Sequence, residues 1–185
     1  PAKPWQGSLF FRRARDNLQT THKMTRSVVC ALKTSPSTVI KDIAKAMSMA
    51  GVERHLKKSA PTILKVNITW HFYYPACSTT PWQFDGAISA LEKLGYRDLI
   101  PAQNRTVVIN PKLGAVNNHL TSVMRKHGLR FVYLYEPETE WIDYRPEARM
   151  LVLDKVYPDG IKIPKMFLGK NALHLPTMKT HVFTT

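Results

Sequence analysis

The chain has 185 residues, 44% of them hydrophobic, so it is long enough for one domain with a sizeable core. Its 27 Lys and Arg against 13 Asp and Glu give a formal charge of +14, which favours anionic partners such as nucleic acid, phosphorylated ligands or acidic protein surfaces. No apolar run has the length of a membrane span, and two cysteines form no disulfide framework, so we expect a cytoplasmic protein without a membrane partner.

Residues 1–23 differ in composition from the rest. Pro1, Pro4 and Gly7 interrupt regular structure, and basic residues outnumber acidic ones. A flexible basic arm, an upstream extension and an organelle presequence each fit this pattern. We expect an extension outside the core, with residues 24–185 forming an α/β domain whose first strand is the apolar run 27–32.

Two helices with clear start signals flank a central strand. The first begins at the Ser35-Pro36 pair, continues through an apolar face and ends before Gly51. Residues 62–68 are β-branched and aliphatic, which predicts a buried strand. A polar loop then leads to a helix over 81–94, where Thr80 is the predicted N-cap and Gln83 completes a capping box.

The remaining elements alternate between strand and helix patterns. We expect strands at 96–102 and 129–135, a short apolar run at 106–109, a loop containing Pro111 and Gly114, and a helix around 120–124 that stops at Gly128. Residues 150–156 and 161–163 around a Pro-Asp-Gly turn predict a hairpin, and 171–175 another strand. The fold class is therefore α/β: a mostly parallel sheet flanked by helices, with a β-hairpin in the C-terminal third.

Polar side chains follow three of the predicted strands. Because parallel strands end at one edge of a sheet, these side chains and the helix N-terminus at Thr80 are expected to converge there. The pattern predicts a site for a phosphate or carboxylate, with the ligand-binding residues Lys65, Asn67, Thr79, Thr80, Gln103 and Asn104. His181 is the candidate acid–base group and Lys179 a catalytic charge stabiliser. In the alternative interpretation Lys65 is an ordinary sheet-edge lysine and the amide residues are turn formers.

Other chemistries have weaker signals. His71, Cys77 and His181 are the residue types that bind zinc or iron, but their spacing matches no ligand motif, so no metal site is predicted and the cofactor stays undetermined. Cys77 has no recognisable base beside it. The aromatic run Trp70, Phe72, Tyr73 and Tyr74 suits stacking on a base, although covering a core is the preferred interpretation.

The segments 62–67, 79–81 and 175–181, with the intervening helix, resemble the domain of unknown function 362 family. That family has a lysine-x-asparagine strand end, a threonine-rich helix start and a later proline-x-x-lysine-x-histidine segment; Val66 stands where the family has proline. The resemblance covers about residues 25–185 and only the N-terminal half of such a protein. It implies an α/β fold and little chemistry. Some family members carry iron–sulfur modules, for which this chain has no cysteine cluster.

Three functions remain open from the sequence. The first is an α/β protein, with or without enzymatic activity, that binds a small anionic ligand at the C-terminal edge of its sheet. The second is a basic nucleic-acid-binding module. The third is a structural subunit or fragment that completes its sheet against a partner protein.

Overall fold

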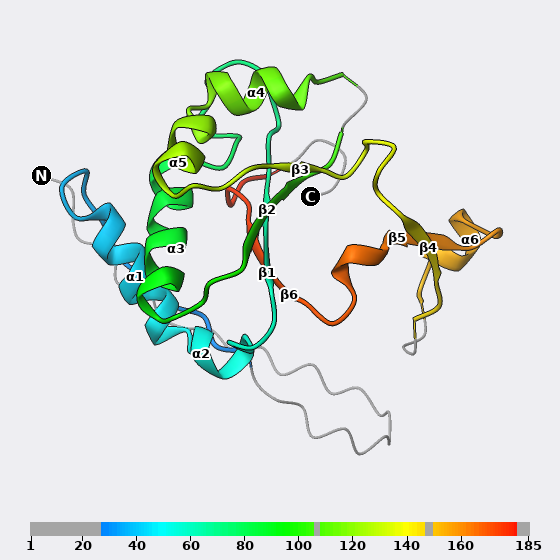
Figure 1. The fold of residues 1–185 in the computed structure, drawn as a ribbon, viewed down its shortest axis with the longest axis horizontal. Helices are drawn as coiled ribbons and strands as arrows, with labels where there is room; N and C mark the ends of the chain where they lie inside the picture. Colours follow the sequence, from blue (N-terminus) through cyan, green and yellow to red (C-terminus); the bar gives the residue numbers. More distant parts are fainter. Residues whose placement is uncertain (1–26, 106–107, 147–149, 181–185) are drawn as a thin grey trace, which may run out of the picture.

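The computed structural model describes residues 27–105, 108–146 and 150–180; the predicted 1–23 extension and His181 lie outside them. A parallel sheet with strand order β3-β2-β1-β6 forms the centre (Figure 1). Its strands are β1 (Thr62–Val66), β2 (Leu99–Gln103), β3 (Val132–Tyr133) and β6 (Asn171–Leu175). A separate antiparallel pair joins β4 (Trp141–Tyr144) to β5 (Ile161–Pro164). The predicted fold class is confirmed.

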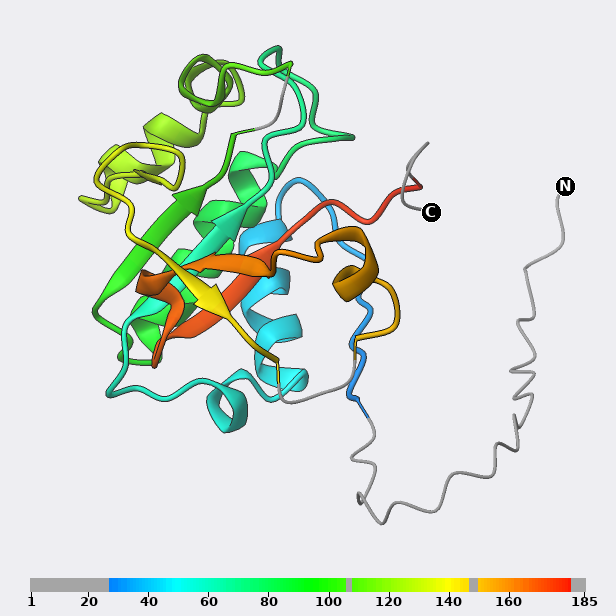
Figure 2. The same ribbon diagram turned by 90° about the vertical axis from the view of Figure 1, so that its right-hand side faces the viewer.

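Helices lie on one face of the sheet and beyond the ends of its strands (Figure 1). They are α1 (Val39–Met49), α2 (Val52–His55), α3 (Pro81–Lys93), α4 (Pro111–Asn117) and α5 (Leu120–Lys126). A short α6 (Leu153–Val156) and a 3₁₀ turn, η1 (Lys165–Phe167), accompany the β4–β5 pair. Figure 2 shows the sheet between the α1 and α3 helices and the β4–β5 arm. None of the helices in the described ranges is long and apolar enough to cross a membrane.

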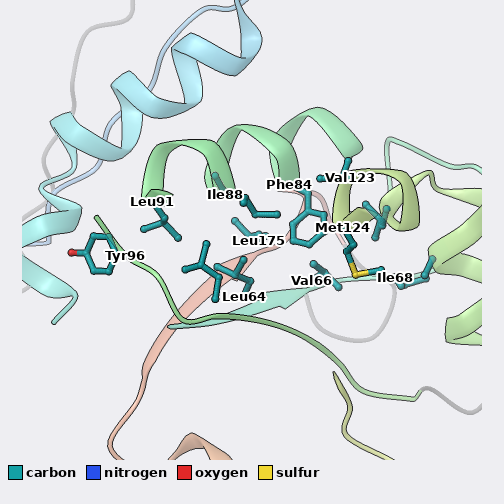
Figure 3. Close-up of a cluster of buried hydrophobic side chains, with 14 of the residues drawn as sticks. Leu64, Val66, Ile68, Phe84, Ile88, Leu91, Tyr96, Val123, Met124 and Leu175 are labelled. Atoms are coloured by element: carbon teal, nitrogen blue, oxygen red, sulfur yellow. The ribbon is translucent and has the colours of Figure 1, made fainter. Parts of the chain in front are cut away.

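The main core fills the space between the sheet and α3 and α5 (Figure 3). Leu64 and Val66 point from β1 toward the helices, as alternation along a strand requires, and both are fully buried. The helices contribute apolar residues at helical spacing, namely Phe84, Ala87, Ile88, Leu91, Leu120, Val123 and Met124. A smaller cluster around Ile63, Ala102 and Leu134 lies on the opposite face, against Met166 and Phe167.

The central part of the sequence folds as its start and stop signals predict. Thr80 is the N-cap of α3 with Pro81 in the first turn, and the chain turns away through Gly95 at φ 90°. The strand predicted at 62–68 is β1, that at 96–102 is β2 shifted toward its C-terminal end, and that at 171–175 is β6. Gly51 follows α1 in the left-handed conformation, at φ 76°.

Four predictions of local structure are wrong. Residues 27–32 form no strand, because no neighbouring strand pairs with them, and Val29 is 88% exposed. β3 occupies only two residues of the expected 129–135 strand. The predicted loop at Pro111 and Gly114 is helix α4. The hairpin partner of β5 is β4, since residues 153–156 turn into the short helix α6.

Candidate functional site

The ends of β1, β2 and β6 meet at one edge of the sheet. β1 pairs in parallel with β2 on one side and with β6 on the other. Lys65 lies in register with Ala102 on β2 and with His174 on β6. The chain segments after these three strands therefore leave the sheet at the same edge, beneath α4 in Figure 1. The predicted site residues that the structure describes lie at the strand ends and in these segments.

Lys65 curls along the strand toward this edge. Its neighbours Leu64 and Val66 point to the helices, so the Lys65 side chain starts on the opposite face. The Nζ atom donates to the Val66 carbonyl at 2.7 Å and to Gln103 Oε1 at 3.1 Å. Burial lowers the pKa of the Lys65 ammonium below its ordinary value of 10.5. Within the described residues it forms no ion pair with a carboxylate.

Asn67 and Thr79 fasten the two ends of the loop that follows β1. Thr79 Oγ1 accepts from the Asn67 backbone N–H at 2.8 Å and donates to the Leu175 carbonyl at 2.5 Å. The Thr79 N–H donates to the Asn67 carbonyl at 2.8 Å, and the Asn67 side chain donates to Thr69 Oγ1 at 3.0 Å. These predicted ligand-binding groups are thus already bonded within the protein, where they hold the loop and β6 together.

Thr80 caps α3 as predicted, with its Oγ1 accepting from the Gln83 N–H at 3.2 Å. The other half of the predicted capping box does not form, because the Gln83 side chain donates to the Pro176 carbonyl at 3.3 Å. Thr177 Oγ1 donates to the Ser78 carbonyl at 2.8 Å. The start of α3 is therefore tied to the segment that follows β6.

Of the remaining predicted residues, the described ones are Asn104 and Lys179, which follow β2 and β6 and form no hydrogen bond with Lys65 within the described ranges. Asn104 is exposed, and its Oδ1 accepts from the Arg105 N–H at 2.8 Å. Lys179 is exposed, and His181 falls outside the described residues. The structure thus brings Lys65 into contact with Gln103 and Asn67 into contact with Thr79, and in the described ranges no hydrogen bond joins the two pairs.

Two features of this edge were not predicted from the sequence: the position of His174 and the exposure of the aromatic side chains after β1. His174 is exposed beside Lys65, on the same face of the sheet, because register partners in a parallel pair point the same way. The alternation of Leu173, His174 and Leu175 carried that signal. The aromatic residues after β1 do not cover a core: Trp70, Phe72, Tyr73 and Tyr74 are 43%, 61%, 46% and 54% exposed.

Within the described part of the chain, no three His, Cys, Asp or Glu side chains gather as metal ligands. Cys77 is a partly buried free thiol. Comparisons with protein-family models, curated proteins and solved structures found no match. The resemblance to the domain of unknown function 362 family stays a prediction.

Proposed function

We propose that the C-terminal edge of the sheet binds a small anionic ligand, a phosphate or a carboxylate, through Lys65. The observation that carries this proposal is the setting of the Lys65 ammonium, which is partly buried and, among the residues that the structure describes, bonded only to the neutral oxygens of Val66 and Gln103. A desolvated cation without a countercharge is unfavourable. An anion that reaches Nζ would supply that charge and so gain affinity.

The charge pattern around this edge supports an anion. Residues 67–80, 104–110 and 176–180, which follow β1, β2 and β6, contain no Asp or Glu. The N-terminus of α3, a helix of 13 residues, adds positive potential from the helix dipole. Of the four strands of the parallel sheet, only β3 is followed closely by acidic residues, which are Glu136, Glu138 and Glu140.

Each group has a specific part in the proposed site. Lys65 supplies the charge, and Gln103 orients it through the bond to Nζ. Asn104 and Lys179, both exposed, are free to approach a ligand from the segments after β2 and β6. His174 on β6 is the nearest imidazole by register and would be the acid–base group if the site is catalytic.

Calorimetric titration with inorganic phosphate, pyrophosphate and succinate tests the proposal. Lys65→Met keeps the aliphatic stem and removes the charge, so binding is expected to fall at least tenfold. Lys162→Met on β5 is the matched control, because it removes the same net charge from an exposed lysine and is expected to bind as the unaltered protein does. The proposal would be contradicted if none of the three anions bound, or if both variants lost the same amount of anion affinity.

The pH dependence gives a second test with a defined sign. A bound anion favours the charged ammonium, so it raises the pKa of Lys65, whereas burial lowers it in the free protein. Affinity is therefore expected to decline with rising pH, starting below the ordinary lysine value of 10.5. A titration series at increasing pH measures this, and an affinity that stays constant up to 10.5 would count against Lys65 as the binding group.

A further inference from the structure

The loop after β1 displays aromatic side chains to solvent while its backbone is held firmly. The Asn118 side chain, in a residue that is 1% exposed, donates to the Trp70 and Phe72 carbonyls, both at 3.1 Å, and accepts from the Tyr74 N–H at 3.2 Å. Asn117 donates to the His71 carbonyl at 2.6 Å. The aromatic loop, residues 70–74, is thus pre-organised by the end of α4.

Close contact between the loop and α4 depends on Gly114. A Cβ atom at this position would lie 2.5 Å from Ile68 Cγ2 and 3.3 Å from the Trp70 carbonyl oxygen. Within the loop, the Tyr73 ring packs edge-on against the ring of His119, with the two ring centroids 5.1 Å apart. The exposed rings therefore stand on a fixed support, so little conformational entropy is lost when they bind a partner.

Positive charge lies at the other end of α4, about 9 Å along the helix axis. A hollow of about 480 Å³ opens there, lined by Arg105, Lys112 and Tyr135 among others. The Arg105 guanidinium lies 6.0 Å from the centre of the Tyr135 ring and forms no ion pair within the described residues. Lys112 is paired with Glu136 at 2.7 Å, an exposed bond that a phosphate can replace.

The sequence around α4 is strongly one-sided in charge. Residues 99–135 contain no Asp or Glu, and they contain the basic residues Arg105, Lys112, Arg125, Lys126 and Arg130. An exposed aromatic platform next to an acid-free basic segment, in a chain of charge +14, has the composition of a surface that binds single strands. An acidic protein would complement the charge but would leave the row of exposed rings without a role.

We propose that the aromatic loop and α4 together bind single-stranded nucleic acid, with bases stacked on the loop and phosphates at Arg105 and Lys112. The carbonyls of Trp70, His71 and Phe72 already accept hydrogen bonds from Asn117 and Asn118, so they do not read base edges. Binding should accordingly depend little on base sequence. This surface binds through residues other than Lys65, so its test does not depend on the proposed anion site.

Fluorescence anisotropy with a labelled oligothymidylate and a labelled oligouridylate, each about 12 nucleotides long, a length within the usual range of single-strand binding sites, tests the stacking. Tyr74→Ala is expected to weaken binding about tenfold or more. Tyr157→Ala is the matched control, because Tyr157 has the same exposed fraction, 54%, but lies beside α6 on the arm. Its affinity should equal that of the unaltered protein.

The charge contribution is measured separately, through the salt dependence. Arg105→Gln should reduce the slope of log affinity against log salt by about 0.7, the value for one phosphate of a single strand. Arg54→Gln, on α2 at the opposite end of the sheet, removes the same charge and should leave the slope unchanged. Absence of binding at low salt, equal loss in the Tyr74 and Tyr157 variants, or equally tight binding of duplex DNA would each overturn the proposal.

Discussion

At the scale of single residues, Asn118 shows how one polar side chain fixes a long loop. It is buried, and buried amides are tolerated only when their hydrogen bonds are satisfied. Its Nδ2 donates to the carbonyls of Trp70, Phe72 and Gly114, and its Oδ1 accepts from the Tyr74 N–H. The loop therefore depends on a residue more than 40 positions later in the chain.

Asn118→Ala should destabilise the protein strongly, because it leaves backbone groups of Trp70, Phe72 and Tyr74 without their partner. We expect a loss of about 1–3 kcal/mol in the free energy of unfolding, measured by urea denaturation. Asn117→Ala is the control, since it removes the one side-chain bond to His71 and should cost less, about 1 kcal/mol. If both variants lose the same stability, the Asn118 network does not hold the loop.

At the scale of elements, a charged cluster joins the end of α5 to α3. His127 is almost fully buried, with Nε2 2.7 Å from Asp85 Oδ1 and Nδ1 3.0 Å from Glu92 Oε2. Lys126 Nζ lies 2.7 Å from Asp85 Oδ2. Burial by itself raises the pKa of the Asp85 carboxyl, but hydrogen bonds from Lys126 and His127 outweigh it, so the pKa is lowered overall.

A lowered pKa in the folded protein makes this cluster a source of acid sensitivity. The stability from ionised Asp85 is complete above the ordinary value of 3.8 and is lost as the pH falls through the lower folded-state value. The Asp85→Asn variant should therefore be less stable than the unaltered protein at neutral pH, and it should lose less of its stability when the pH falls below 3.8. Urea denaturation at a series of pH values measures both differences. Asp143→Asn, an exposed carboxyl on β4, is the control and should follow the unaltered protein.

The elements also show which structural signals a sequence carries. The threonine-proline start of α3 was sufficient to predict it, whereas the equivalent Asn110-Pro111 start of α4 was obscured by Gly114. That glycine is typical of a loop when taken alone, and only the approach of Ile68 explains its presence inside a helix. The strand predicted at 171–175 is likewise present as β6, but pairing partners decide strands, so the partner of β5 was misplaced.

The candidate site was also only partly predictable: its place in the sheet could be predicted, but its side-chain contacts could not. A parallel sheet was predicted from the alternation of strands and helices, whereas the strand order β2-β1-β6, which places Lys65 at the predicted edge, was not. The contact with Gln103 depends on a side-chain path that no pattern encodes. The exposure of the aromatic loop was equally hidden, because an apolar run without periodicity fits a buried segment and an exposed loop alike.

At the scale of the whole molecule, the β4–β5 arm is a two-stranded sheet apart from the four-stranded one (Figure 1). The sheet face on this side has only a small apolar cluster, around Ile63, Ala102 and Leu134. Several large apolar side chains of β4 and of the segment around α6 are exposed, including Trp141, Leu151 and Val156. A two-stranded sheet with so little buried apolar area contributes weakly to stability.

Hydrogen exchange should therefore separate the two parts. Amides of β4 and β5 are expected to exchange at least about tenfold faster than those of β1, since local opening of a small sheet requires less free energy than opening of the core. Mass spectrometry of peptides covering Trp141–Tyr144 and Thr62–Val66 measures this difference. Equal protection would mean that the arm unfolds only together with the whole domain.

The pairing of β1 with β6 has a consequence for how the chain acquires its structure. Asn171 Nδ2 donates to Thr62 Oγ1, which lies 109 residues earlier. During synthesis β1 emerges long before its β6 neighbour, and contacts across such separations form slowly because a large loop must close first. One edge of β1, a largely buried strand, is thus left open on the nascent chain. The interval before β6 arrives is when aggregation competes most directly with folding.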